Sequence, residues 1–214
     1  MKPNRYGISR PSNTRNPLPV VVLVCDDKRT AVAYFSLLKH QVKAKLYLEV
    51  VKAPCHGATP DGVVDVAMNK AKQLADESSS DDGSGDAVWA LIDLEIEPKT
   101  QTQAQNAKTK AGKAGVCVAL SNPCFEVWTL AHLVDTGEAF QNCGAVVTRV
   151  KAEWKKQFGT DFGNKKAQAD YSKLMPLRET AMERCKRREQ NDPSWTEVYK
   201  IVEFIAALCH EKLT

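Results

Sequence analysis

Three short apolar runs and one weakly alternating segment, separated by polar segments with helical patterning, most constrain how this 214-residue chain can fold. The first run, residues 18–25, is continuously apolar and rich in β-branched side chains, which is typical of a parallel strand covered on both faces. Further strands are expected within residues 41–52, 87–92 and 116–120. Because helical patterns lie between the runs, the sequence predicts an α/β fold with a mostly parallel sheet flanked by helices.

The chain divides into three regions around this pattern. Residues 1–17 hold four basic residues and no acid, and we expect a flexible basic arm there. The α/β domain is expected over residues 18–136, and a helical C-terminal region packed on it over residues 137–214. Helices are expected in that region at residues 144–156, 170–189 and 194–212. At the start of the last helix, Ser194 and Glu197 have the spacing of a capping box.

Composition narrows the class of protein. The apolar fraction of 43% and the charged fraction of 26% are typical of a globular protein. No run approaches the length of apolar sequence that a membrane span needs, and the start of the chain lacks the apolar core of a secretory signal. The seven cysteines are odd in number and scattered singly, which predicts reduced thiols and a cytoplasmic location.

Acidic residues follow two of the predicted strands. Asp26 comes directly after the first strand, and Asp93 and Glu95 come at the end of the third. Since the carboxyl ends of parallel strands meet at one edge of a sheet, these carboxylates are expected to lie together. Oxygen ligands of this kind suit Mg²⁺ or Mn²⁺. The alternative is that strand ends carry acids simply because loops are polar.

The segment after the fourth strand is a second candidate for part of a site. A polar Ser121-Asn122 pair precedes a proline, where an apolar strand is expected to break and a helix to begin. Glu126 on this helix is a candidate further ligand or outer-shell group. His132 is a candidate to orient that carboxylate or to donate a proton. The alternative is a core helix with a paired glutamate and a buried, hydrogen-bonded histidine.

Basic side chains suggest contact with a nucleic-acid backbone. Clusters of lysine and arginine suit phosphate contact, although a solvated charged surface is the commoner explanation. The candidate residues are Lys28, Arg29, Lys165, Lys166, Arg184, Arg187 and Arg188.

Several motifs of the chain resemble those of a known family. Residues 121–132 read Ser-Asn-Pro-Cys-Phe-Glu-Val-Trp-Thr-Leu-Ala-His, which matches every fixed position of the pattern Ser-Asn-Pro-x-Phe-Glu-x-Trp-x-x-x-His. Residues 24–35, 89–95 and 191–203 echo the family's other motifs. On these residues the chain resembles the RloB-like proteins, which belong to the Toprim-type group of prokaryotic defence-associated proteins.

The resemblance implies a fold, an activity and partners. It implies a Toprim-like α/β fold whose acidic strand ends bind Mg²⁺ for phosphodiester cleavage. Asp93 and Glu95 would ligate the metal, and Asp26 would serve as base or third ligand. The substrate would be tRNA or DNA, and the protein would act in an antiviral abortive-infection system with an ABC-type or AAA-type ATPase encoded alongside. A homo-oligomer is one alternative for its assembly.

The chain also departs from the family's first and second motifs. Asp26 stands where the family has Glu, Asp27 where it has Gly, and Ala31 where it has Glu; Glu95 replaces the second Asp of the later pair. Because a displacement of about 1 Å can lower a rate about a hundredfold, these changes bear on activity. The alternative function is therefore a catalytically impaired module that binds the ATPase partner, a nucleotide or nucleic acid.

Overall fold

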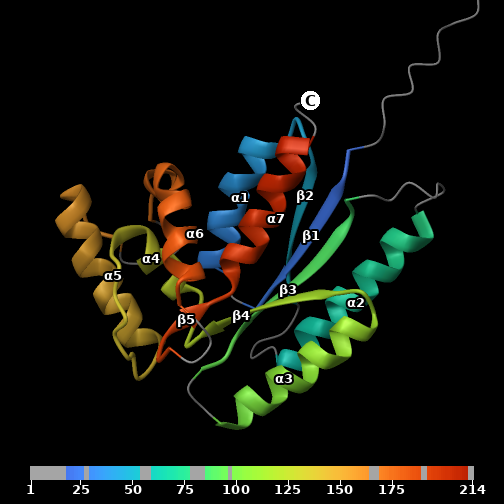
Figure 1. Ribbon diagram of the computed structural model, residues 1–214, viewed down its shortest axis with the longest axis horizontal. Helices are drawn as coiled ribbons and strands as arrows, with labels where there is room; N and C mark the ends of the chain where they lie inside the picture. Colours follow the sequence, from blue (N-terminus) through green and yellow to red (C-terminus); the bar gives the residue numbers. More distant parts are fainter. Residues whose placement is uncertain are drawn as a thin grey trace, which may run out of the picture.

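A five-stranded sheet forms the centre of the computed structural model, which describes residues 18–26, 29–53, 59–77, 85–95, 98–163, 169–188 and 192–211 (Figure 1). The strand order is β2-β1-β3-β4-β5. The first four strands of this order are parallel, and β5 pairs antiparallel with β4. The strands are β1 (Val20–Cys25), β2 (Tyr47–Lys52), β3 (Ala87–Asp93), β4 (Cys117–Asn122) and β5 (Trp195–Thr196).

Helices cover both faces of the sheet. On one face lie α2 (Pro60–Glu77) and α3 (Pro98–Lys113). The other face carries α1 (Thr30–Val42), α4 (Glu126–Leu133), α5 (Cys143–Phe158), the 3-10 helix η2 (Tyr171–Leu177), α6 (Arg178–Lys186) and α7 (Val198–Glu211). Figure 1 shows the two groups on opposite sides of the strands.

Alternate residues of β1 point to opposite faces, as a strand requires. Val21 and Leu23 belong to the apolar cluster with α1, α4 and α7, whereas Val22 and Val24 belong to the cluster with α2 and α3. All four side chains are at most 1% exposed. The continuously apolar run therefore serves two cores at once, and the predicted α/β fold with a mostly parallel sheet is confirmed.

The C-terminal region differs from the prediction at residue 194. Trp195 and Thr196 form β5, and the last helix begins only at Val198. The predicted capping box is wrong because the Glu197 carboxylate accepts the Leu120 N–H at 3.1 Å, and because Ser194 Oγ accepts the N–H of Phe140 at 3.3 Å.

Two predictions about organisation remain predictions. The expected basic arm, residues 1–17, lies outside the described residues, and the division into residues 18–136 and 137–214 stays a prediction. Within the described ranges, no helix has both the length and the apolar character needed to cross a membrane. The expected cytoplasmic location stays a prediction.

Candidate functional site

Two neighbouring strands end in acids at the carboxyl edge of the sheet. Asp93 is the last residue of β3, and Asp26 directly follows β1, where its N–H donates to the Leu91 carbonyl at 3.2 Å. From β1 the chain crosses to β2 on one side and then returns to β3 on the other. Ligand sites of open α/β sheets lie at such a reversal, beyond the carboxyl ends of the strands. The structure thus brings Asp26 and Asp93 to the predicted edge.

Backbone contacts join Asp93 and Glu95 to the turn after β4. The N–H of Phe125 donates to Asp93 Oδ1 at 2.9 Å, and the N–H of Glu95 donates to the carbonyl of Pro123 at 3.0 Å. Glu95 has a φ of +40°, a left-handed conformation that few residues other than glycine adopt, and its side chain is exposed. Ser121, near the end of β4, pairs with Asp93, and Phe125 just after Pro123 holds its carboxylate, so this segment borders Asp93.

The carboxylates of this edge are of the ligand type that a divalent ion prefers, but their oxygens are too far apart to bind one ion together. Carboxylate oxygens suit Mg²⁺, and ligands at about 2.1 Å from one ion lie at most about 4.2 Å apart. Among the described residues, the one group of three metal-binding side chains with all donor atoms within 4.8 Å is Cys124, Glu126 and Cys143. Asp26, Asp93 and Glu95 are not such a group, so these side chains would have to move closer to share an ion.

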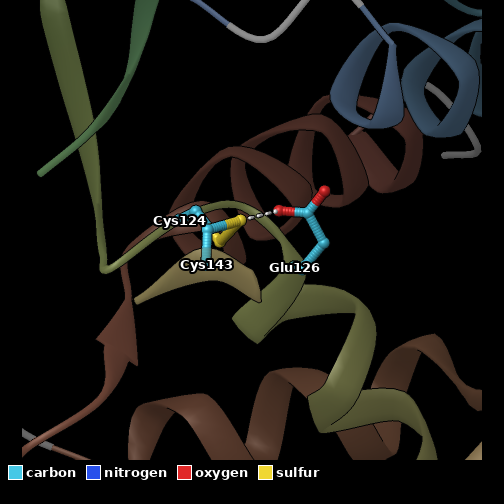
Figure 2. A group of neighbouring side chains, drawn as sticks. All are labelled: Cys124, Glu126 and Cys143. Carbon is cyan, nitrogen blue, oxygen red and sulfur yellow. Dashed lines mark hydrogen bonds between the residues drawn. A yellow bond between two sulfur atoms is a disulfide. The ribbon is translucent and has the colours of Figure 1, made fainter. Parts of the chain in front are cut away.

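Glu126 is the first residue of α4 and is 1% exposed (Figure 2). Its Oε1 accepts the hydroxyl hydrogen of Thr30 at 2.8 Å. Its Oε2 lies 3.1 Å from Sγ of Cys143, the first residue of α5. These contacts orient the carboxylate, a task that the sequence had suggested for His132.

Cys124 and Cys143 form a disulfide, so the prediction of reduced thiols is wrong for this pair. The two residues are 19 positions apart, and only the packing of α4 against α5 brings them together. Since both sulfurs are bonded to each other, neither acts as a thiolate ligand for a metal in this state. Cys117, Cys185 and Cys209 are not disulfide-bonded.

His132 is a core residue. It is 2% exposed, and its Nδ1 lies 2.8 Å from the Trp128 carbonyl. A carbonyl only accepts, so Nδ1 carries the proton, and Nε2 accepts the hydroxyl of Tyr34 at 3.3 Å. Burial lowers the pKa of His132 to about 4, although the Trp128 hydrogen bond opposes this. Because both nitrogens are engaged within the core, His132 has no nitrogen left to contact a substrate.

Three of the basic candidates make contacts within the protein. Arg184 donates to the Ala131 carbonyl at 2.7 Å near the end of α4. Arg187 and Arg188 both pair with Asp135, at 2.8 and 3.0 Å, and the hydrogen bond from Arg188 lowers the pKa of that carboxyl. These three arginines therefore hold α6 against the end of α4.

Of the remaining basic candidates, only Arg29 lies within the described residues. Arg29 is exposed in the turn that leads from the Asp26 edge into α1. Lys28, Lys165 and Lys166 lie outside the described residues. Arg29 is thus the predicted phosphate-contacting residue that the structure places beside the acidic edge.

The fold and the edge together define an α/β protein with acidic strand ends at the point where its mostly parallel sheet reverses order. A family model described as RloB-like protein matches residues 21–205, which is most of the sequence. The chain belongs to the RloB-like family, as its motifs had indicated.

No curated protein matches significantly. A de novo designed Rossmann fold protein is similar at 21% identity over 48% of this chain and 84% of the design, with a TM-score of 0.33.

Proposed function

We propose that this protein is a metal-dependent nuclease that cleaves phosphodiester bonds of nucleic acid, either tRNA or DNA. In this proposal it acts in an antiviral abortive-infection system with an ABC-type or AAA-type ATPase. The observation that carries the proposal is the placement of Asp26 and Asp93 at the carboxyl ends of adjacent parallel strands where the strand order reverses. Membership of the RloB-like family supports the same reading.

Each residue of the edge has a proposed task. Asp93 and Glu95 would hold Mg²⁺ or Mn²⁺, and the Phe125 N–H orients the Asp93 carboxylate. Asp26 is proposed to accept a proton from the attacking water or to act as a third ligand. When bound, the ion supplies Lewis-acid stabilisation of the developing phosphate charge. Arg29 contributes positive charge for a phosphate at the start of α1.

Glu126 is proposed to act without binding the metal ion itself. Its two oxygens already contact Thr30 and Cys143, and burial at 1% exposure keeps it away from bulk water. Its contribution is to fix the start of α4, next to the Phe125 amide that holds Asp93.

A nuclease assay with tRNA and DNA in Mg²⁺ or Mn²⁺ tests the proposal, with the ATPase partner added where one is encoded alongside. Asp93→Asn should lower cleavage at least about a hundredfold, because it removes a charged oxygen ligand while keeping the side-chain shape. Glu179→Gln is the matched control: it removes an exposed acid at the start of α6 and should leave the rate unchanged. Equal rates for wild type and Asp93→Asn would refute the assignment.

The rival function is a module that binds the ATPase partner, a nucleotide or nucleic acid without cutting. It is favoured by the spacing of Asp26, Asp93 and Glu95, which do not form a three-ligand group within 4.8 Å among the described residues. Calorimetric titration with Mn²⁺ separates the two functions. Binding that is lost in Asp93→Asn supports the nuclease, whereas no heat at millimolar Mn²⁺ supports the rival.

A further inference from the structure

A buried carboxylate lies against a disulfide where α4 and α5 begin (Figure 2). Oε2 of Glu126 is 3.1 Å from Sγ of Cys143, and this sulfur is bonded to Cys124. A disulfide sulfur has no proton to donate, whereas a thiol at Cys143 would donate its S–H to the carboxylate across this distance. The contact therefore becomes a hydrogen bond when the pair is reduced.

The two sulfurs differ in access. Cys124 is 2% exposed, whereas Cys143 is partly exposed. Cys143 is also the first residue of the 16-residue helix α5, and the partial positive charge of a helix N-terminus stabilises a thiolate. Cys143 is thus the more exposed residue of the pair, and its sulfur has both a proton acceptor and a favourable field.

We propose that Cys124 and Cys143 form a reversible thiol–disulfide site in which Glu126 accepts the proton of the Cys143 thiol. The co-reactants are low-molecular-weight thiols and their disulfides, of the glutathione type. This proposal does not rest on the proposed nuclease activity, although the two share Glu126, and Cys124 directly precedes Phe125, whose N–H holds Asp93.

The exchange is balanced in both directions. For reduction, a small thiolate attacks Sγ of Cys143, the bond between the two protein sulfurs breaks, and Cys124 leaves as a thiolate and takes up a proton. A second small thiol then releases Cys143 from the mixed disulfide, so that one protein disulfide and two thiols give a protein dithiol and one small disulfide. For oxidation, Glu126 takes the proton of Cys143, and the thiolate attacks the small disulfide and displaces one small thiolate. Cys124 then loses its proton to solvent and attacks Sγ of Cys143, which forms the protein disulfide and displaces the second small thiolate.

The free cysteine Cys185 provides a comparison within the chain. It is 2% exposed, and burial raises the pKa of its thiol to about 12. It also lies on α6, in a part of the core that a small thiol does not reach. Cys185 should therefore stay unmodified under conditions that convert the pair.

The test uses the full chain in buffers of reduced and oxidised glutathione, with alkylation and mass spectrometry as the readout. The pair should convert together in one two-electron step, with Cys185→Ser behaving as wild type. Starting from the reduced protein, oxidation by oxidised glutathione near neutral pH should be at least about tenfold slower in Glu126→Gln than in wild type. This difference should shrink at alkaline pH, where the thiol ionises without a base.

Three results would overturn the proposal: a disulfide that millimolar glutathione leaves intact in the folded protein, independent conversion of the two cysteines, or equal oxidation rates for wild type and Glu126→Gln. Thr30→Val is the second variant, because it removes the hydroxyl that orients Glu126 while keeping the side-chain volume. It should slow oxidation severalfold. If Glu126→Gln does not fold, an unchanged rate in Thr30→Val counts against the role of Glu126.

Discussion

A single buried histidine makes the stability of this protein depend on pH. The folded state binds a proton at His132 only below a pKa of about 4, whereas the unfolded chain binds it near the ordinary value of 6.5. The folded state is therefore stabilised above pH 6.5 relative to acid. This contribution falls as the pH drops from about 6.5 to about 4. Between about pH 7 and about pH 5 the loss should be about 2 kcal/mol.

Urea denaturation of wild type and His132→Gln at both pH values checks this expectation. Other groups titrate in both proteins, so the difference between the two pH dependences isolates His132. The variant should lose less stability on acidification than wild type. Parallel pH dependences would show that His132 is not held neutral in the core.

Residue chemistry predicted the position of the acids better than their partners. Asp26 and Asp93 could be placed at one edge because apolar strands in alternation with helices determine where strand ends lie. The hydroxyl that holds Glu126 belongs to Thr30, 96 positions earlier in the chain, and no local pattern predicts such a contact. Cys143 likewise had no motif around it, so the disulfide could not be foreseen.

One buried carboxylate links three elements of the fold. Glu197 is 2% exposed and accepts the Leu120 N–H of β4, while Lys108 of α3 and Lys200 of α7 pair with it at 2.9 and 2.6 Å. Burial opposes ionisation of Glu197, but the hydrogen bonds from the two lysines lower its pKa. Glu197→Ala should therefore reduce the free energy of unfolding by about 2 kcal/mol, since it leaves a buried N–H without this acceptor.

The control is Glu203→Ala, which breaks the ion pair between Glu203 and Lys186. Their side chains are 51% and 42% exposed, respectively. An exposed pair of this kind contributes under about 1 kcal/mol. Chemical denaturation of both variants gives the comparison. Similar losses would mean that Glu197 is no more important than a surface ion pair.

The disulfide fixes the start of α4 to the start of α5. A bond that closes a loop of 19 residues stabilises a fold by about 3 kcal/mol, mainly by restricting the unfolded chain. Adding a reductant should lower the unfolding free energy of wild type by about that amount. Cys143→Ser should start from the lower value and show no further change with reductant, and a reductant effect that persists in this variant would contradict the assignment.

At the scale of elements, length and apolar content decided what could be predicted. The four parallel strands each have six or seven residues, enough for an apolar run or an alternating pattern to be recognised. The two-residue strand β5 has no such pattern and exists because β4 offers an edge to Trp195 and Thr196. Residues 170–189 were predicted as one helix, but Pro176 lies in the 3-10 helix η2, and α6 follows it.

At the scale of the whole molecule, one sheet is shared by two apolar clusters. Alternate residues of β1 and β3 belong to the two clusters, and β4 contributes Ala119 to one and Val118 and Leu120 to the other. Loss of either core would therefore disturb strands that the other core also needs. β5, from the C-terminal region, also pairs with β4 and places Trp195 in the cluster with α2 and α3. Residues 18–136 and 137–214 should therefore unfold in one cooperative transition.

Cavity-forming substitutions on opposite faces test this expectation. Val64 on α2 and Val150 on α5 are both fully buried, one in each cluster. Val64→Ala and Val150→Ala should each lower the unfolding free energy by about 2 kcal/mol. In each variant, far-UV circular dichroism and tryptophan fluorescence should report the same midpoint. If Val150→Ala instead split the transition, with fluorescence changing before the loss of the sheet, the C-terminal helices would be a separately folding unit, because Trp154 lies on α5 beside the substituted residue.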